Sequence, residues 1–342
     1  MSAGAAAVVF AVTVSAQTSG LINERGIIFD PATKKVFVVN RGRNTIDAID
    51  TRDGSARSIR IGAAPVSIAV NPNAGRVYVA NSGDGTVTVI DNASERVLAT
   101  LAVGANPYSI AANTQTGSVY VSHTFSDKTS VIDGTTITQV TTGSIDRIAI
   151  DAGANVAWLL AYEGGDLTAM QGPSRVLRKT SAGKHAWGLA LNELTHTLYV
   201  ARMGTADVMA IDGSSHAILG AGRTPCAIAV NSKTSTIYVA NYTDASVTIL
   251  DGATGLITAT VATGERPQAV AVDPGRNLAY VANTLGNTLT VIDGAQRKAL
   301  ATLPAGKAPY ALAVDPGSRR VYVANEAGPT NFTVVDTGGL NR

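Results

Sequence analysis

Polar and aromatic side chains that could contact a ligand interrupt a motif that is otherwise repeated with little change. The motif reads VYVAN at residues 77–81, IYVAN at 237–241, AYVAN at 279–283 and VYVAN at 321–325. The matching stretches in the middle of the chain read VYVSH (119–123), AWLLAY (157–162) and LYVAR (198–202). Candidate ligand-binding residues lie in these stretches, beside them, or in loops expected on the same face: Tyr108, His123, Phe125, Arg147, Tyr162, Glu163, His185, Trp187, Arg202 and Tyr242.

Metal binding is one chemistry that these residue types allow. The imidazole and carboxylate groups of His123, Glu163 and His185 suit zinc or a similar ion. They lie far apart in the sequence, however, and no i, i+4 or CxxC-type spacing supports a shared site. We therefore predict no metal site and no cofactor.

Catalysis has no recognisable motif in this chain. There is no GxSxG, HExxH or GxxxxGK[ST] string, and the one cysteine, Cys226, opens an inner strand where a buried, inert thiol is expected. Those inner strands are almost uncharged, so a carboxylate pair for hydrolysis is also missing. We assign no catalytic residue and favour a binding protein. The alternative is an enzyme, such as a lyase, a lactonase or a cofactor-dependent oxidoreductase.

A single nucleic acid strand could bind through charge and stacking, because several arginines and aromatic rings lie in the loops. These residues are Arg41, Arg147, Arg202 and Arg266 with Tyr108, Trp187 and Tyr242. The net charge is only +2 and the arginines are scattered, so we expect no nucleic acid partner. Single-stranded DNA binding remains a second alternative.

A repeat of about 40 residues positions all of these side chains. Its copies begin near residues 21, 62, 104, 143, 183, 222, 264 and 306. Each copy contains four short strands, here named a to d. In the second copy they are predicted at 67–71, 76–80, 86–91 and 97–103, with a turn at Asn71-Pro72 between the first two.

The strands predict an all-β fold, a single β-propeller of four-stranded blades. They are β-branched and almost continuously apolar, which indicates that both sheet faces are buried. Strands a, b and c occur eight times but strand d only seven times, so we predict eight blades with the last lacking its outer strand. Seven blades are the alternative. Residues 9–14 could supply the missing strand.

The repeat resembles the YVTN-repeat β-propeller family, which includes YncE-like proteins. The resemblance rests on the Tyr-Val-Ala-Asn stretches 78–81, 238–241, 280–283 and 322–325, with the flanking G-x-x-P and VID-G elements, and covers about residues 21–342. It implies the fold and no particular activity. In a propeller the d-to-a and b-to-c loops open on one face, around the channel mouth, where ligands usually bind. The candidate residues lie in those loops, as do Arg41, Tyr310 and Glu326.

The N-terminal run 4–16, GAAAVVFAVTVSA, has the length and the small residues before Gln17 that signal peptidase requires. We predict a signal peptide at 1–16 and a mature propeller at 17–342, located in the periplasm or outside the cell. The run could instead be an N-terminal strand. No segment is long enough to span a membrane. We expect a monomer that binds a small ligand or a protein through the channel-mouth face.

Overall fold

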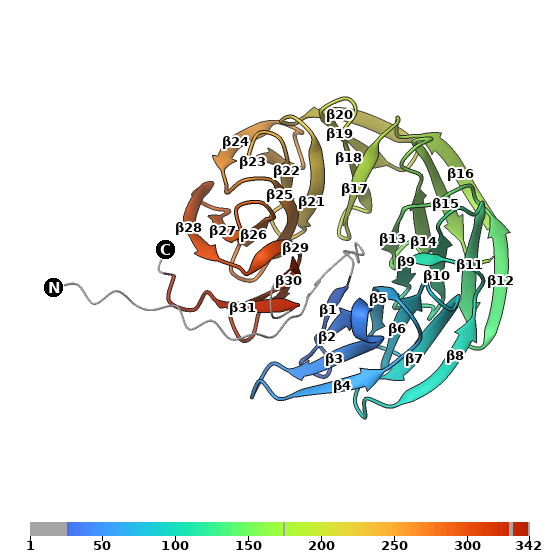
Figure 1. The fold of residues 1–342 in the computed structure, drawn as a ribbon. Helices are drawn as coiled ribbons and strands as arrows, with labels where there is room; N and C mark the ends of the chain where they lie inside the picture. Colours follow the sequence, from blue (N-terminus) through green and yellow to red (C-terminus); the bar gives the residue numbers. More distant parts are fainter. Residues whose placement is uncertain (1–25, 174, 328–330, 341–342) are drawn as a thin grey trace.

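The computed structural model describes residues 26–173, 175–327 and 331–340. Within these ranges the chain forms 31 β-strands and one short 3-10 helix, η1 (Arg41–Arg43). The strands build eight antiparallel sheets arranged as blades in a ring (Figure 1). The predicted all-β, eight-bladed propeller is confirmed, and the seven-bladed alternative is wrong.

Each blade consists of consecutive strands, from the innermost strand a to the outermost strand d. The first four blades contain β1 (Ile27–Asp30), β2 (Lys35–Asn40), β3 (Thr45–Asp50) and β4 (Ala56–Arg60); β5 (Pro65–Asn71), β6 (Arg76–Asn81), β7 (Thr86–Asp91) and β8 (Val97–Ala102); β9 (Pro107–Ala112), β10 (Val119–His123), β11 (Lys128–Asp133) and β12 (Thr136–Thr141); and β13 (Arg147–Asp151), β14 (Val156–Leu160), β15 (Asp166–Gln171) and β16 (Arg175–Ser181).

The other four blades follow the same order. They contain β17 (Ala186–Asn192), β18 (Thr197–Arg202), β19 (Asp207–Asp212) and β20 (Ser215–Gly220); β21 (Pro225–Asn231), β22 (Thr236–Asn241), β23 (Ser246–Asp251) and β24 (Ile257–Ala262); β25 (Pro267–Asp273), β26 (Leu278–Asn283), β27 (Thr288–Asp293) and β28 (Lys298–Pro304); and β29 (Lys307–Asp315), β30 (Arg320–Ala327) and β31 (Phe332–Asp336).

The eighth blade has three described strands, while the other seven have four. This matches the predicted absence of an outer strand after the last copy of strand c. The proposed replacement, residues 9–14, and the predicted signal peptide at 1–16 both lie outside the described residues.

The apolar core lies between the blades. One buried cluster contains Ile46 and Ile59 of the first blade with Ile68 and Val79 of the second, and comparable clusters follow around the ring. Both faces of the middle strands are therefore buried, which explains their almost continuous apolar sequence.

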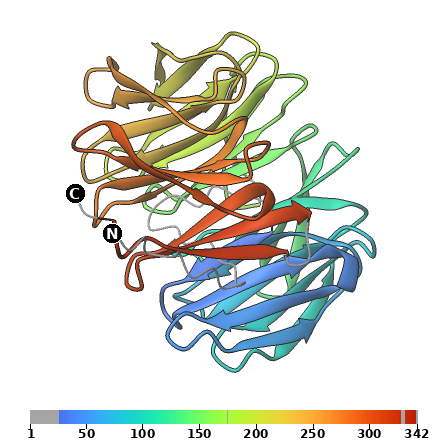
Figure 2. The same cartoon turned by 60° about the vertical axis from the view of Figure 1, so that its left-hand side comes forward.

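The ring closes between the eighth blade and the first, which lie next to each other in Figure 2. Residues of the first blade, including Ile27 and Phe29, share one apolar cluster with the eighth blade. Two hydrogen bonds also cross the junction, from Arg320 Nη1 to the Thr51 carbonyl (3.2 Å) and from Asn331 Nδ2 to Asn40 Oδ1 (2.6 Å).

Among the described residues, no helix has the length and apolar character needed to cross a membrane.

Candidate functional site

One face of the ring, here called the mouth face, carries the d-to-a and b-to-c loops. Its loops are joined by a turn that recurs in many blades. The residue before the inner strand has a positive φ, and its carbonyl accepts an N–H from the b-to-c loop, as in Ser82 N to Ala64 O (3.0 Å) and Met203 N to His185 O (3.1 Å). The left-handed backbone of His185 (φ 60°) is therefore a feature of the scaffold.

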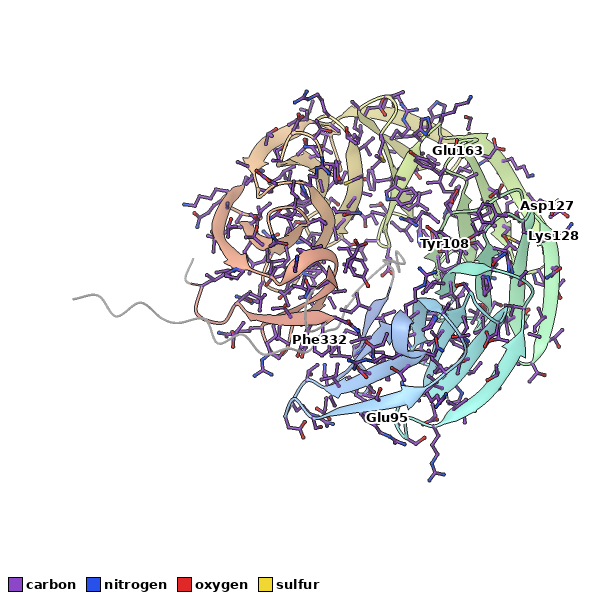
Figure 3. The ribbon with its side chains drawn as sticks, in the orientation of Figure 1. Glu95, Tyr108, Asp127, Lys128, Glu163 and Phe332 are labelled. Carbon is purple, nitrogen blue, oxygen red and sulfur yellow. The ribbon has the colours of Figure 1, made fainter. Side chains whose placement is uncertain are left out.

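A β-bulge follows this turn in most of the inner strands. The extra residue breaks the register with strand b, and such bulges redirect a side chain. The bulged residues are Val66, Trp187, Cys226, Gln268 and Tyr310, and a register shift of the same kind falls beside Tyr108. Except for Cys226, which is buried, the residue at this position is at least partly exposed at the inner edge of the mouth face. Figure 3 shows Tyr108 there, on the inner side of the ring.

A buried polar pair joins strands b and c in the blades that keep the consensus. Asn81 Nδ2 donates to the Thr88 hydroxyl at 2.9 Å, and Asn241 and Asn283 make the same bond to the hydroxyl seven residues later. These asparagines are fully buried. They hold the b-to-c loop in place and offer nothing to a ligand.

His123 occupies the position of the consensus asparagine in the third blade, and it also bonds to the hydroxyl seven residues later. Its side chain is 1% exposed, with Nδ1 2.9 Å from the Ala105 carbonyl and Nε2 2.8 Å from the Ser130 hydroxyl. A carbonyl can only accept, so Nδ1 carries a proton. The one hydroxyl proton of Ser130 lies between two acceptors in the neutral state, His123 Nε2 and the Val103 carbonyl at 2.9 Å. This corrects our sequence interpretation of His123 as a ligand-binding residue: it is an internal substitute for the consensus asparagine.

The burial of His123 predicts a pH-dependent stability. Burial lowers the pKa of its imidazole below the ordinary value of 6.5, because the charged ring would lose its hydration. The contribution of His123 is therefore complete above about pH 6.5 and is lost as the pH falls from there through the lower folded-state pKa. We expect His123→Asn protein to lose less stability than wild type between about pH 7.5 and 5, measured by thermal unfolding. Parallel losses in the two proteins would contradict this role.

The fourth and fifth blades replace the asparagine in two other ways. Ala161 leaves the hydroxyl of Thr168, seven residues later, buried without a described partner. Arg202 forms a bidentate ion pair with Asp207, with Nε to Oδ1 at 2.5 Å and Nη2 to Oδ2 at 2.7 Å, and the two side chains are only 13% and 17% exposed. Arg202 is thus committed to its own blade, and we leave it out of the candidate site.

Four of the candidate residues lie together as an aromatic cluster, which consists of Arg147, Tyr162, His185 and Trp187. The Tyr162 ring centroid lies 5.0 Å from that of His185 and 5.2 Å from that of Trp187, edge-on to the indole. The Arg147 guanidinium stacks 3.7 Å from the Trp187 centroid. The backbone positions the cluster, since Tyr162 N–H donates to Asp146 Oδ2 and His185 N–H to the Tyr162 carbonyl, both at 2.8 Å.

Two further candidates lie apart from the ring contacts of this cluster. Glu163 is exposed in the loop that follows Tyr162 (Figure 3). Tyr242 is partly buried and accepts a hydrogen bond from Arg266 Nη1 at 3.1 Å, with the guanidinium 5.2 Å from its ring centroid. Arg266 and Tyr242 thus form a separate pair on the sixth and seventh blades.

A cavity of about 700 Å³ opens on the mouth face where the eighth blade meets the first three. The residues that line it include the aromatic residues Tyr108, Phe125 and Tyr310 and the charged residues Arg41 and Glu326. Hydroxyl and amide groups complete the wall, from Ser82, Asn106, Thr124 and Asn331. The candidates Tyr108 and Phe125 therefore lie at this cavity, here called the mouth cavity, while the aromatic cluster lies on the fourth and fifth blades.

The sequence interpretation left Arg41, Tyr310 and Glu326 out of the candidate site. One signal for Tyr310 was available, because Pro309-Tyr310 repeats Pro107-Tyr108 at the same place in another copy. These three residues meet Tyr108 and Phe125 at the mouth cavity only because the last blade packs against the first.

Phe125 combines two features that are unusual in a folded protein. Its side chain is 94% exposed, and its φ is +61°, a region that bulky side chains rarely adopt. The Phe125 side chain is therefore available for contact with a molecule at the mouth face.

Metal ligands do not gather anywhere in the described residues: no group of three or more His, Cys, Asp or Glu side chains is placed to hold an ion. Cys226 is buried, 3.2 Å from the Pro267 carbonyl and 3.6 Å from that of Ala240. Its thiol is packed in an apolar cluster with the adjoining ring of Tyr242.

Comparisons with solved structures place this chain among known propellers. Dihydro-heme d1 dehydrogenase NirN, solved in complex with DHE, superposes with a TM-score of 0.71 and 13% identity, over 94% of this chain and 76% of that one. AztD from Citrobacter koseri, in the apo form, gives 0.67 and 12%, over 90% and 92%. Hydrazine synthase from Kuenenia stuttgartiensis gives 0.60 and 18%, over 78% and 94%. At these identities the likeness establishes the fold alone.

Sequence comparison gives a more specific assignment for part of the chain. No curated protein matches it. A family model described as YNCE-like beta-propeller matches residues 219–328, which run from the end of the fifth blade into the eighth. The resemblance inferred from the Tyr-Val-Ala-Asn repeats is thereby confirmed: this chain is an eight-bladed β-propeller that matches the YNCE-like family over residues 219–328.

Proposed function

We propose that this propeller is a binding protein that takes a small ligand in the mouth cavity, in the periplasm or outside the cell. The mouth cavity carries the proposal, because its volume of about 700 Å³ lies within the range of roughly 300–1,000 Å³ that is typical of small-molecule sites. The location is supported by the apolar run 4–16 alone.

The chemistry of the cavity wall supports binding. Tyr108, Phe125 and Tyr310 offer large apolar surfaces, while the hydroxyl and amide groups can fix an orientation. Acid–base catalysis would need titratable groups within hydrogen-bond reach of each other. Arg41 and Glu326 are the only Asp, Glu, His, Lys or Arg residues in the described wall, and none of the ion pairs among the described residues joins them. These observations favour binding over the enzyme alternative.

A protein partner is the second candidate, and the aromatic cluster favours it. Trp, Tyr and Arg are the residue types that dominate the energy of protein interfaces. Arg147, Tyr162 and Trp187 are partly exposed on the mouth face and already held in place by stacking. The nucleic acid alternative is less well supported, because Arg202 pairs with Asp207 and Arg266 bonds to Tyr242.

A thermal-shift screen tests the small-ligand proposal. The panel contains peptides, saccharides, quinones, divalent metals and oligonucleotides. A ligand at about 100 times its Kd should stabilise the protein by about 2.7 kcal/mol. Phe125→Asn should melt at the wild-type temperature without ligand, since asparagine tolerates positive φ, but should lose the ligand shift.

Leu285→Asn is the matched control for this variant. Leu285 holds the equivalent loop position in the seventh blade and is 55% exposed, but it lies outside the wall of the mouth cavity. It should keep the full ligand shift. If no panel member shifts the wild type, or if the shift survives Phe125→Asn, the mouth cavity is not the binding site.

A further inference from the structure

Two opposite charges stand on either side of the ring junction. Arg41 and Glu326 each directly follow the consensus asparagine of strand b, which is Asn40 at the end of β2 in the first blade and Asn325 within β30 in the eighth. The same position in the other six blades carries uncharged side chains: Ser82, Thr124, Tyr162, Met203, Tyr242 and Thr284. The only two charges in this series therefore fall on neighbouring blades, and both line the mouth cavity.

Both side chains are exposed. Neither forms an ion pair or hydrogen bond with any other residue in the described parts of the chain. The two blades are nevertheless joined close to these charges, because Asn331 Nδ2, between β30 and β31, donates to Asn40 Oδ1 at 2.6 Å and Asn40 directly precedes Arg41. A cation and an anion are thus held on neighbouring blades without forming an ion pair.

This arrangement favours a ligand that carries both a negative and a positive charge. A simple anion would be attracted by Arg41 and repelled by Glu326, and a simple cation the reverse. A molecule that carries both a carboxylate and an ammonium satisfies both groups, since guanidinium binds carboxylate with two hydrogen bonds and carboxylate accepts from ammonium. The rings of Tyr108, Phe125 and Tyr310 in the same wall would contact an apolar side chain.

We propose that the ligand of the mouth cavity is a short zwitterionic peptide with an aromatic side chain. Its carboxylate binds Arg41, its amino group binds Glu326, and its ring lies against Phe125 and the two tyrosines. A single amino acid would leave much of the cavity of about 700 Å³ unfilled, which favours two or three residues. This inference rests on the proposed function and names the ligand class for the same site.

Calorimetric titration with the tripeptide Gly-Phe-Gly tests it, using the whole chain. The probe is compared with its N-acetylated and C-amidated forms. We expect each cap to weaken binding at least tenfold. Arg41→Gln should weaken binding of the free tripeptide by the same factor, and amidation should then cause no further loss of affinity. Glu326→Gln should likewise weaken binding of the free tripeptide, and acetylation should then cause no further loss. Both side chains are exposed, so neither change should alter the melting temperature.

The possible results separate this inference from the proposed function. Equal binding of free and capped tripeptides, or no binding at millimolar concentration, overturns the zwitterion assignment. If another class in the screen then gives a shift that Phe125→Asn abolishes, the mouth cavity is still a ligand site. If nothing in the screen binds, both proposals fail.

Discussion

Replacing Asp207 with alanine should lower the free energy of unfolding by about 3 kcal/mol, because it removes one partner of a largely buried ion pair. Arg202 would keep its charge at 13% exposure and lose two hydrogen bonds, at 2.5 and 2.7 Å. Urea denaturation followed by circular dichroism measures the change.

The stability lost in Asp207→Ala should be recovered by copying the corresponding pair of another blade. In the second blade the two corresponding residues are Asn81 and Thr86, joined by a hydrogen bond of 3.0 Å. The double variant Arg202→Asn with Asp207→Thr copies that pair and should recover most of the lost stability. A single Asp207→Ala protein as stable as wild type would show that the ion pair contributes nothing to the fold.

Gly165→Ala should destabilise the protein by about 3 kcal/mol or more, through two effects that add. Gly165 has a φ of +71°, which costs an alanine roughly 1–2 kcal/mol. An added Cβ would also overlap the carbonyl group of Gly183, in the loop that precedes His185. The two loops are bonded here, since Ala182 N–H donates to the Gly165 carbonyl at 2.7 Å.

The adjacent Gly164 provides the control. A Cβ added there would meet nothing closer than 3.8 Å, so Gly164→Ala should change the unfolding free energy by no more than about 0.5 kcal/mol. Chemical denaturation of both variants gives the comparison. Equal stability of the two would mean that the loops separate without cost, and that the aromatic cluster is not held by its backbone.

The sequence was sufficient to predict the fold because the information is local and repeated eight times. Blade number, strand order and the missing outer strand all follow from counting apolar stretches between turns. In the second blade the observed strands differ from the predicted ranges by at most two residues. For example, β5 begins at Pro65, two residues earlier than predicted, and β6 ends at Asn81, one residue later. A proline can open a strand because its first residue need not donate to the ladder.

The candidate site was harder to predict because one local signal was overlooked and one determinant is not local. His123 looked like a ligand-binding residue, and only its partner seven residues later, Ser130, indicates a structural role. That signal was present, since Thr88, Thr248 and Thr290 stand at the same spacing from Asn81, Asn241 and Asn283. The mouth cavity had no such signal, because its wall joins the first blade to the last.

The bulged residue of the inner strands has a consequence for how such a protein changes over time. Except for the sixth blade, where the bulged residue is the buried Cys226, each blade with a bulge contributes one side chain to the mouth. The apolar clusters that hold the ring lie between the blades. A substitution at Tyr108 or Gln268, which lie outside these clusters, can therefore alter recognition with little effect on folding. Specificity in this ring can evolve one blade at a time, with each trial leaving the rest of the binding surface intact.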